Sequence, residues 1–481
     1  MSSQTTSFYW HDYETWGADP SRDRPAQFAG LRTDLDFNPI GDPLVIFARP
    51  ADDILPQPGA CMVTGISPQR AHAEGMPEAD FFRFIHAEMM QPGTCSLGYN
   101  SLRFDDEVTR YGMYRNFFDP YEREWKNGNS RWDLIDVLRL TRALRPQGVE
   151  WPTREDGVTS FRLEELTAAN GIEHAGAHDA LVDVRATIAL ARLVRERQPR
   201  LYDYVFMHRD KESVSSLLRA ATPAPVLHVS ARYPARQGCL AAVLPLAWHP
   251  RNRNSVIVYD LRTDPQVLLD LTPDQLSERL YTPTAELPEG VERIPLKEVH
   301  INKAPVVVPM STLTQAAREE WQMDSTAEQR HSQILLRHRA EIEAKLVALY
   351  SAHEFPARED PDLDLYGGFL NDADRGRCER VRATPPEQLA ELDMRFDAPK
   401  LHEMLFRYRA RNWPETLSPA ERLRWDSYRR ERLTATDGGS SIDLASYRRE
   451  LSRLAVDGSL SPQQREVVSE LLDWPGVIGI E

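Results

Sequence analysis

The sequence predicts a mixed α/β domain, followed by a smaller β-rich region and then by a helical C-terminal region. Three observations support this order. Residues 1–198 alternate short apolar runs with longer segments in which apolar residues recur at helical spacing. Residues 224–310 hold short apolar runs separated by Pro, Asn and Asp, which is typical of β-strands. From about residue 311 the helical spacing returns.

The elements of the first region can be placed in order. An aromatic and β-branched run that ends in acidic residues, TSFYWHDYET, predicts a buried first strand. The stretch PAQFAGLRTDLDFNPIGDPLVIFARP predicts two further strands joined by a turn that carries Asn38, Pro39 and Gly41. TCSLGYN at 94–100 predicts another short strand. Helices are expected at 78–90, 106–116, 131–145, 161–171 and 179–197.

Domain boundaries follow from these changes in pattern. A chain of 481 residues corresponds to about three domains at roughly 150 residues each. We predict domains at 1–198, 199–352 and 353–481, with the stretch PAREDPDLDL at 356–365 as a linker into the last one.

Composition narrows the class of protein. No apolar run approaches the roughly 20 residues of a transmembrane helix, and the N-terminus lacks the basic start and apolar stretch of a signal peptide. Four scattered cysteines argue against a disulfide framework or a zinc knuckle. We therefore expect a cytoplasmic protein that does not contact a membrane. We also expect it to be monomeric and nucleoid-associated, which composition alone does not show.

The net charge of −15 argues against a protein that coats nucleic acid by bulk attraction. The charge is unevenly distributed, because the net values of 1–198, 199–350 and 351–481 are −9, 0 and −6. Bound cations would offset part of the negative charge of the first segment, so a local basic groove is still compatible with the sequence.

The first candidate for chemistry is the pair Asp12 and Glu14 at the end of the first strand. Side chains two apart on a strand share a face, so both carboxylates point to one site. Mg²⁺ prefers oxygen ligands of this kind. The alternative is a solvated surface pair, which is the commoner fate of a D-x-E triplet.

Two further segments carry acidic residues at element boundaries. Asp105 follows the strand LGYN and opens the next helix, where its alternative role is an N-cap. His178 follows the loop HAGA, and Asp183 lies in the first turns of the long helix at 179–197. The alternatives are a loop histidine without a special task and an acid that stabilises the helix dipole.

The order strand-D-x-E, then N-xxx-FD, then H-xxxx-D before a helix resembles the DEDDh class of RNase H-like 3′→5′ exonucleases. Further stretches resemble bacterial exonuclease I over essentially the whole chain: YWHDYETWG, DRPAQFA, ADDILPQPGA, TGISPQ, GYNSLRFDDEVTR, NSRWDLIDV, SFRLEELTAANGIEHAGAHDALVD, LAWHPRNRN, HINKAP and FRYRARNWPETL. Departures occur at RYPARQGC, 434–441 and 283–292. None of them touches the acidic residues.

This resemblance implies a fold and an activity. The fold would be an α/β RNase H-like (DnaQ-like) exonuclease domain, then a β-rich SH3-like domain, then an α-helical C-terminal domain. The activity would be processive 3′→5′ hydrolysis of single-stranded DNA to 5′-mononucleotides, in DNA repair and recombination.

The same resemblance implies a two-metal mechanism. Two Mg²⁺ ions, for which Mn²⁺ is a possible substitute, would be held by four carboxylates: Asp12, Glu14, Asp105 and Asp183. One ion would activate the attacking water and the other would stabilise the leaving 3′-oxygen. His178 would take the proton of the water, because a neutral imidazole is available as a base above neutrality.

Single-stranded DNA is held by aromatic stacking and by cations that follow its backbone. The residues that we expect to contact DNA are Glu14, Arg110, Tyr121, Trp125, Arg139 and Arg162 in the first domain, Asn254, Lys297 and His300 in the second, and Tyr366 in the third. The alternative for each is that the aromatic residues pack and the arginines pair with acids.

An arginine-rich stretch in the third domain could flank the DNA or form an amphipathic helical face. Residues 405–432 hold eight arginines against four acids, interleaved with Phe406, Tyr408, Trp413, Trp425 and Tyr428. The resemblance also implies binding of the acidic C-terminal tail of single-stranded-DNA-binding protein, for which Arg337 and Arg339 are candidate contacts.

Two other functions compete with this hypothesis. An exoribonuclease of the same catalytic class would use the same acids, but it would leave nearly 300 further residues unexplained. A catalytically silent adaptor would bind single strands without needing all five catalytic residues. Comparing the digestion of oligo-dT with that of oligo-U distinguishes a DNA exonuclease from an exoribonuclease. Shortening of the bound strand in Mg²⁺ distinguishes an enzyme from a silent adaptor.

Overall fold

The computed structural model describes residues 5–176, 178–352 and 358–480. The chain divides into two compact units. The first unit comprises Met1–Arg131, His174–Ile188 and Ala357–Glu481, and the second comprises Trp132–Glu173 and Ala189–Pro356. The first unit therefore combines the beginning and the end of the chain. The predicted domain boundaries at 198 and 352 stay a prediction, because this division follows compactness alone.

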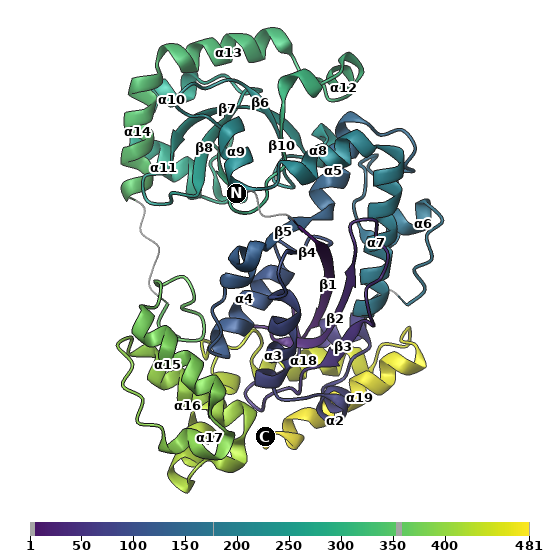
Figure 1. Ribbon diagram of the computed structural model, residues 1–481, viewed down its shortest axis with the longest axis vertical. Helices are drawn as coiled ribbons and strands as arrows, with labels where there is room; N and C mark the ends of the chain where they lie inside the picture. The colour runs from purple at the N-terminus through teal and green to yellow at the C-terminus, as the bar shows by residue number, and fades with distance from the viewer. Residues whose placement is uncertain (1–4, 177, 353–357, 481) are drawn as a thin grey trace. The chain divides into compact units, whose positions relative to one another are not determined.

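The first unit is built around a five-stranded sheet (Figure 1). The strand order is β3-β2-β1-β4-β5, and β1 pairs antiparallel with β2 and parallel with β4. All nine residues of β2 are buried, and β1 is buried except at Asp12, which is partly exposed. The bounds are β1 Ser7–Thr15, β2 Pro25–Thr33, β3 Leu44–Phe47, β4 Thr94–Gly98 and β5 Ser130–Asp133.

The predicted first four strands are confirmed, but the helix that was expected to begin at 131 begins later. Residues Ser130–Asp133 form β5, and α5 spans Leu134–Leu144. The reason is local, because the Asp133 carboxylate accepts a hydrogen bond from the Ile135 N–H at 3.0 Å and so caps the helix.

The N-terminal segment also holds helices, of which the last two pack against β1 and β2. The helices are α1 Pro58–Thr64, α2 Pro68–Glu74, α3 Glu78–Met89 and α4 Asp105–Arg115. The short α1 and α2 were not predicted, although each begins with a proline in its first turn. α3 and α4 pack closely, since a Cβ on Gly112 would lie 1.8 Å from the Phe82 ring. The contact therefore requires glycine at this position.

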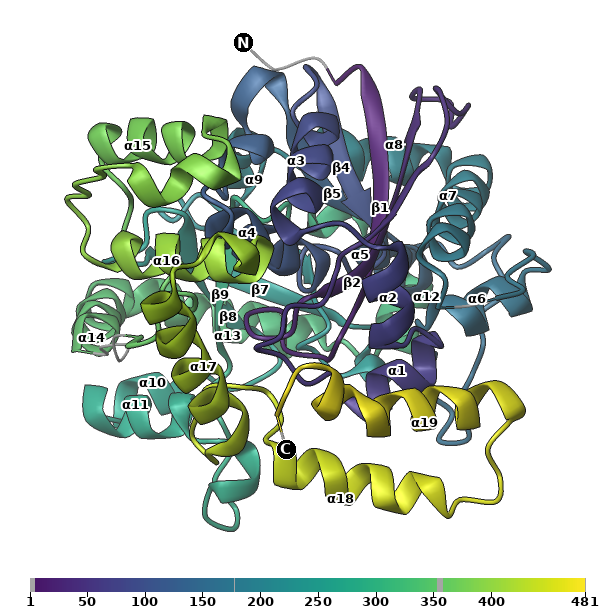
Figure 2. The ribbon, with the colours of Figure 1, turned by 90° about the horizontal axis from the view of Figure 1, so that it is seen from below.

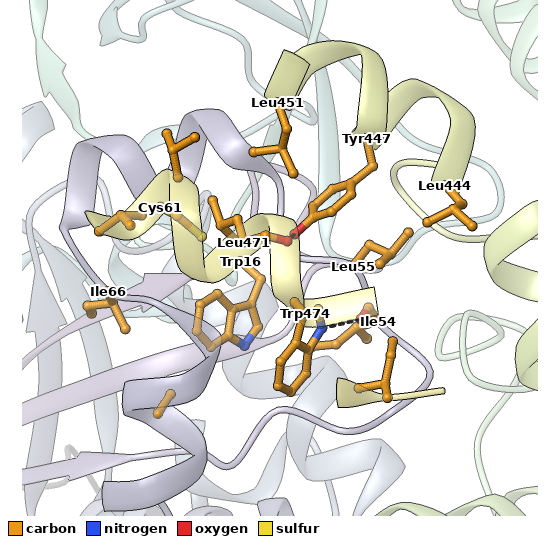
Figure 3. Packing of buried hydrophobic residues seen from close by; sticks show 14 of the residues in the cluster. Trp16, Ile54, Leu55, Cys61, Ile66, Leu444, Tyr447, Leu451, Leu471 and Trp474 are labelled. Carbon is orange, nitrogen blue, oxygen red and sulfur yellow. Dashed lines mark hydrogen bonds between the residues drawn. The ribbon is translucent and has the colours of Figure 1, made fainter. Parts of the chain in front are cut away.

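The C-terminal helices complete the core of the first unit. They are α15 Asp372–Ala383, α16 Lys400–Asn412, α17 Pro419–Thr434, α18 Leu444–Ala455 and α19 Pro462–Val477. α18 and α19 pack together, and α19 lies against α1 and α2 (Figure 2). Their apolar side chains form one buried cluster with Trp16 and Cys61 (Figure 3). Trp474 within it also donates to the Ile54 carbonyl at 3.3 Å.

A buried ionic network also ties the C-terminal helices to the N-terminal segment. The Asp53 side chain is fully buried and lies 2.9 Å from Arg411 and 3.5 Å from Arg24. Arg411 also pairs with Asp362 at 2.6 Å, and Arg407 pairs with Asp362 at 2.9 Å. The two acids therefore share Arg411, and Asp53 is paired with arginines from distant parts of the sequence.

The second unit contains an antiparallel five-stranded sheet in the order β10-β6-β7-β8-β9, which confirms the predicted β-rich region. The strands are β6 Val226–Val229, β7 Leu240–Trp248, β8 Ser255–Asp260, β9 Leu296–His300 and β10 Val307–Pro309.

The second unit also contains helices. The predicted return of helical structure after residue 311 is confirmed, whereas the helices α8 to α11 were not predicted. The helices of this unit are α5, α6 Leu163–Ala169, α8 Pro199–Met207, α9 Lys211–Leu217, α10 Gln266–Asp270, α11 Pro273–Tyr281, α12 Gln315–Glu320, α13 Ser325–Arg337 and α14 Arg339–Ala352. Among the helices that the structure describes, none is long and apolar enough to cross a membrane.

Candidate active site

The β1 strand carries two carboxylates on one face. Asp12 lies opposite Ala29 of β2, and Glu14 lies opposite Gln27 of the same strand. Glu14 is 8% exposed, so its carboxylate is largely removed from water. The strand geometry places both acids at the same end of the sheet, as the spacing of two predicts.

The third carboxylate reaches the same place from α4. Oδ1 of Asp105 accepts a hydrogen bond from the Tyr13 backbone N–H at 3.1 Å, between Asp12 and Glu14. The alternative in which Asp105 only caps the helix is wrong, because α4 begins at Asp105 itself and Phe104 holds the cap position without a side-chain bond. The carboxylate is thus directed to β1.

The fourth carboxylate belongs to α7, which spans Ala180–Arg197 and so begins one residue later than predicted. Asp183 lies in its first turn. The Asp179 carboxylate accepts from the N–H groups of Leu181 and Val182 at 3.1 and 3.3 Å and so caps the helix. The side chain of Gln27, opposite Glu14 on the sheet, accepts from the Ala180 N–H at 3.3 Å. Gln27 therefore anchors the start of α7 beside Glu14.

Two histidines of the HAGAH segment lie beside Asp183. Ligand atoms of Glu14, His178 and Asp183 all lie within 4.8 Å of one another. His178 is exposed and has a φ of 70°, a left-handed conformation that is uncommon for a non-glycine residue and recurs at functional sites. His174, which the sequence analysis did not select, has a side chain that is only 6% exposed, and its Nε2 lies 2.5 Å from Oδ1 of Asp183.

The electrostatics of the site reflect four acids in a small volume. Burial and the nearby carboxylates of Asp105, Glu14 and Asp183 raise the pKa of Asp12 well above its usual value. Burial and the carboxylates of Asp183 and Asp105 raise the pKa of Glu14 to about 9. Burial also raises the pKa of Asp183, although the hydrogen bond from His174 opposes that change. Such crowding of like charges calls for protons or cations.

The donor set fits divalent metal ions. Carboxylate oxygens are the ligands that Mg²⁺ and Mn²⁺ prefer. Burial and repulsion between carboxylates raise the pKa of Asp12 and of Glu14, and a bound cation would relieve that repulsion. The acids that would hold the ions are Asp12, Glu14, Asp105 and Asp183. The sequence predicted these residues, and the structure brings all four together in the first unit.

Comparison with known families decides the relationship. The model "Exonuclease" matches residues 9–191, "Exonuclease I SH3-like domain" matches 209–352, and "Exonuclease I C-terminal domain" matches 359–477. Exodeoxyribonuclease I of Escherichia coli K12 is 49% identical over 432 residues, which is 90% of either chain. The chain belongs to the exonuclease I family.

Solved structures of exonuclease I agree over the full length. The exonuclease I of Methylocaldum szegediense has a TM-score of 0.94 at 52% identity, covering 99% of this chain and 100% of the other. E. coli exonuclease I in complex with a dA16 oligonucleotide has a TM-score of 0.94 at 46% identity, covering 98% and 100%. Other similar structures are a zinc-bound E. coli exonuclease I–ssDNA complex and an SSB/exonuclease I structure with an inhibitor.

In this exonuclease I relative, the predicted DNA contacts of the first unit differ in exposure. Trp125 is 66% exposed and Tyr366 is 57% exposed, so both rings are open to a ligand. Arg110 is buried and bonds Glu124, Glu107 and the hydroxyl of Tyr366. Tyr121 is partly buried, with the Arg110 guanidinium 5.4 Å from its ring. Arg110 therefore orients two aromatic residues, whatever else it contacts.

Phe369 is an exposed aromatic residue that the sequence analysis missed. Its side chain is 85% exposed, and its ring lies 5.9 Å from that of Tyr121 in an edge-on arrangement. The segment that carries it follows Tyr366 and two glycines. The clue available in the sequence was this Tyr-Gly-Gly-Phe spacing of two aromatics in a polar stretch.

The predicted contacts of the second unit include one exposed cation and several engaged side chains. Arg162 is exposed and lies 3.4 Å from Glu165. Arg139 is buried, bonds Asp136 at 2.5 Å and lies over the Phe161 ring. These contacts fit the alternative of ion pairing for Arg139, and both DNA contacts stay predictions.

Asn254, Lys297 and His300 lie on or beside two paired strands, since Ser255 of β8 lies opposite His300 of β9. The Asn254 carbonyl accepts from the Ile301 N–H at 2.8 Å, and the Lys297 ammonium lies 4.4 Å from the centre of the Tyr233 ring. Burial lowers the pKa of His300, so the ring is favoured in its neutral form. Their contact with DNA stays a prediction.

The arginine-rich stretch at 405–432 is largely engaged in packing. Phe406 and Trp425 belong to one buried cluster, and Arg407 and Arg432 are buried and paired with acids. Arg409 pairs with Glu421. These contacts favour the helical-face alternative for the buried arginines over direct contact with DNA.

Proposed function

We propose that the chain is a metal-dependent exonuclease that digests single-stranded DNA from the 3′ end to 5′-mononucleotides, in DNA repair and recombination. The observation that carries the proposal is the meeting of Asp12, Glu14, Asp105, His178 and Asp183 at one end of β1, in a chain of which 99% aligns with a solved exonuclease I. Magnesium is the proposed ion, with manganese as a possible substitute.

The roles of the residues follow from their positions. Bound divalent ions would activate the attacking water and stabilise the leaving oxygen. The four carboxylates would hold them, and the Tyr13 N–H and Gln27 fix two of the segments that carry these acids. His178 is exposed beside Glu14 and Asp183, where its imidazole can accept the proton of the attacking water.

A digestion experiment tests this proposal. A 5′-labelled single strand should yield a ladder of labelled products that shortens with time in Mg²⁺ and stays intact in chelator. The matched duplex should be resistant, and oligo-dT should be digested much faster than oligo-U. Asp183→Asn should give no ladder, whereas Glu155→Gln, an exposed acid on a loop, should digest normally. Equal cleavage of oligo-U would favour the exoribonuclease alternative, and an intact strand in Mg²⁺ the silent adaptor.

We further propose that Tyr121, Trp125, Tyr366 and Phe369 form the surface on which bases stack. Stacking of a base on an aromatic ring contributes about 1–3 kcal/mol in alanine substitutions. In an Asp183→Asn background, which prevents digestion, Phe369→Ala should weaken binding of a labelled oligo-dT about tenfold, as measured by anisotropy. Phe84→Ala, which removes a partly exposed ring from α3, is the matched control and should bind normally.

We propose that Arg337 contacts the acidic tail of single-stranded-DNA-binding protein. Arg337 ends α13 and is exposed, whereas Arg339 donates to the carbonyls of Ala220 and Ala221. The affinity of an acidic tail peptide for the protein should therefore fall in the Arg337→Ala variant. The affinity of the same peptide for the wild type should fall at high salt. An unchanged affinity in Arg337→Ala would remove this assignment.

We propose that the active species is a monomer, which size-exclusion chromatography with light scattering would check.

A further inference from the structure

The HAGAH segment places two histidines near Asp183 in different ways. His178 is exposed and belongs to the group of ligand atoms within 4.8 Å of one another. His174 is outside that group among the residues that the structure describes. Its side chain is only 6% exposed, and it contacts Asp183 directly through Nε2. The two histidines therefore cannot be interchanged.

The chemistry of the His174 contact is defined by its partner. A carboxylate oxygen accepts, so the Nε2 of His174 carries the proton and donates to Oδ1 of Asp183 at 2.5 Å. A carboxylate has two oxygens, and a hydrogen bond to one of them leaves the second for a cation. Carboxylates that bind metals are commonly oriented by hydrogen bonds of this kind from outside the ligand set.

The orientation of the Asp183 side chain depends on such a contact. It lies in the first turn of α7, beside the loop that carries His178, and three other carboxylates face the same volume. Repulsion from these carboxylates favours rotation of the Asp183 side chain away from them. The hydrogen bond from the Nε2 of His174, a largely buried donor, opposes that rotation.

We propose that His174 is a positioning residue for the metal site: it holds Oδ1 of Asp183 and thereby presents the remaining carboxylate oxygen to a divalent ion. The inference rests on the proposed function, since it assumes that Asp183 binds a metal ion. His174 itself touches neither the ion nor the substrate, so its removal should change metal affinity and leave the chemical step intact at saturating metal.

The test measures metal binding directly, without turnover. Calorimetric titration of Mn²⁺ into the full chain gives the dissociation constant for the wild type, His174→Leu and His174→Gln. His174→Leu introduces an apolar side chain of similar size that cannot donate a hydrogen bond, and it should weaken Mn²⁺ binding by about 10–100-fold. His174→Gln retains an N–H donor and should recover most of the affinity.

The Mg²⁺ dependence of DNA digestion separates the two histidines. His174→Leu should need more Mg²⁺ for half-maximal turnover but approach the wild-type kcat at saturation. His178→Ala should keep the Mg²⁺ requirement and lose kcat at every concentration. If His174→Leu does not fold, His174→Asn replaces it, because the shorter amide falls short of the Nε2 position.

Unchanged or tighter Mn²⁺ binding by folded His174→Leu would overturn the inference, and tighter binding would mean that His174 competes with the ion. Failure of the wild type to bind Mn²⁺ would instead overturn the proposed function. The two failures are therefore distinguishable in the same titration.

Discussion

The backbone N–H of Tyr13 donates to Oδ1 of Asp105 at 3.1 Å, and this bond joins α4 to the strand between its two acids. An acid 92 residues further along the chain is thereby tied to the strand that carries Asp12 and Glu14. The contact serves two purposes, because it satisfies a buried N–H group and places a third carboxylate at the site.

These two purposes can be separated by substitution. Asp105→Asn keeps an oxygen that accepts from Tyr13, so its free energy of unfolding should remain close to that of the wild type, while activity falls at least 10²-fold. Asp105→Ala should lose activity equally and also lose about 1–3 kcal/mol, because a buried N–H is left unpaired. Urea denaturation and digestion rates check both expectations. Full activity in Asp105→Asn would contradict the role of Asp105.

His178→Ala should lower turnover by about 10²-fold or more, the range for loss of a general base. The residue is exposed and begins no helix, so the melting temperature should change little. Mn²⁺ binding should persist, because four carboxylates remain. His338→Ala, another histidine that is partly exposed, is the control. Unaltered turnover in His178→Ala would remove the assignment of the base.

Without metal, the protein should lose stability as the pH rises. Glu14 has a pKa of about 9 in the folded chain, above the usual 4.5, so the folded state holds a proton that the unfolded state has released between these values. Its contribution is therefore complete below about pH 4.5 and is lost as the pH rises toward 9, with a slope of at most about 1.4 kcal/mol per pH unit for one proton.

Urea denaturation in chelator at several pH values should show this decline. Mg²⁺ should reduce this loss of stability, because cations replace the protons. Glu14→Gln should make the pH profile in chelator shallower, and the raised pKa values of Asp12 and Asp183 account for the slope that remains. A flat pH profile of the metal-free wild type would contradict the origin given for the raised pKa.

At acid pH the buried ion pairs of Asp53 should no longer stabilise the fold. Burial alone would raise the pKa of Asp53, but Arg24, Arg411 and Arg432 hold it below its usual value. For a lowered pKa the contribution to stability is present above the unfolded value of about 4 and is lost as the pH falls through the folded value. Unfolding should therefore set in below about pH 4.

Substitution tests the same network at neutral pH. Asp53→Ala leaves buried arginines without their acid and should cost about 3–5 kcal/mol. Asp80→Ala breaks the exposed pair with Arg83 and should change stability by less than about 1 kcal/mol. Comparable losses in the two variants would show that burial of the network is not what makes it important.

The C-terminal helices should be essential for the stability of the first unit. Trp474 is buried in the cluster that includes Trp16, two residues after Glu14 (Figure 3). Trp474→Ala should therefore lower the free energy of unfolding by about 3–5 kcal/mol. Val477→Ala, at an exposed position near the end of the same helix, should have little effect. A small loss in Trp474→Ala would mean that the cluster can repack.

Much of the first unit could be predicted from short stretches of sequence. The alternation around Asp12 and Glu14 predicts a strand with both acids on one face, since strand periodicity is a local property. The start of α7 near Asp179 follows from its capping residues in the same way. The start of α5 was placed too early, because the capping role of Asp133 was not recognised.

Exposure could not be predicted in this way. Arg110 and Trp125 were both expected to contact DNA, but the first is buried among acids and the second is open. Phe369 was missed because one phenylalanine in a polar segment is usually a packing residue. Whether a side chain is buried depends on partners from other segments, here Glu124 and Tyr366 for Arg110.

The sequence by itself predicted the first four strands and the helix α7 near the site, the four acids and His178 as the site residues, and the family. These features depend on periodicity, on capping and on motifs that span a few residues. Only the tertiary structure decided that Asp105 bonds Tyr13, that His174 holds Asp183, and that the last helix packs beside Trp16. Such contacts join segments through packing and hydrogen bonds whose partners are set by the whole fold, so no local pattern specifies them.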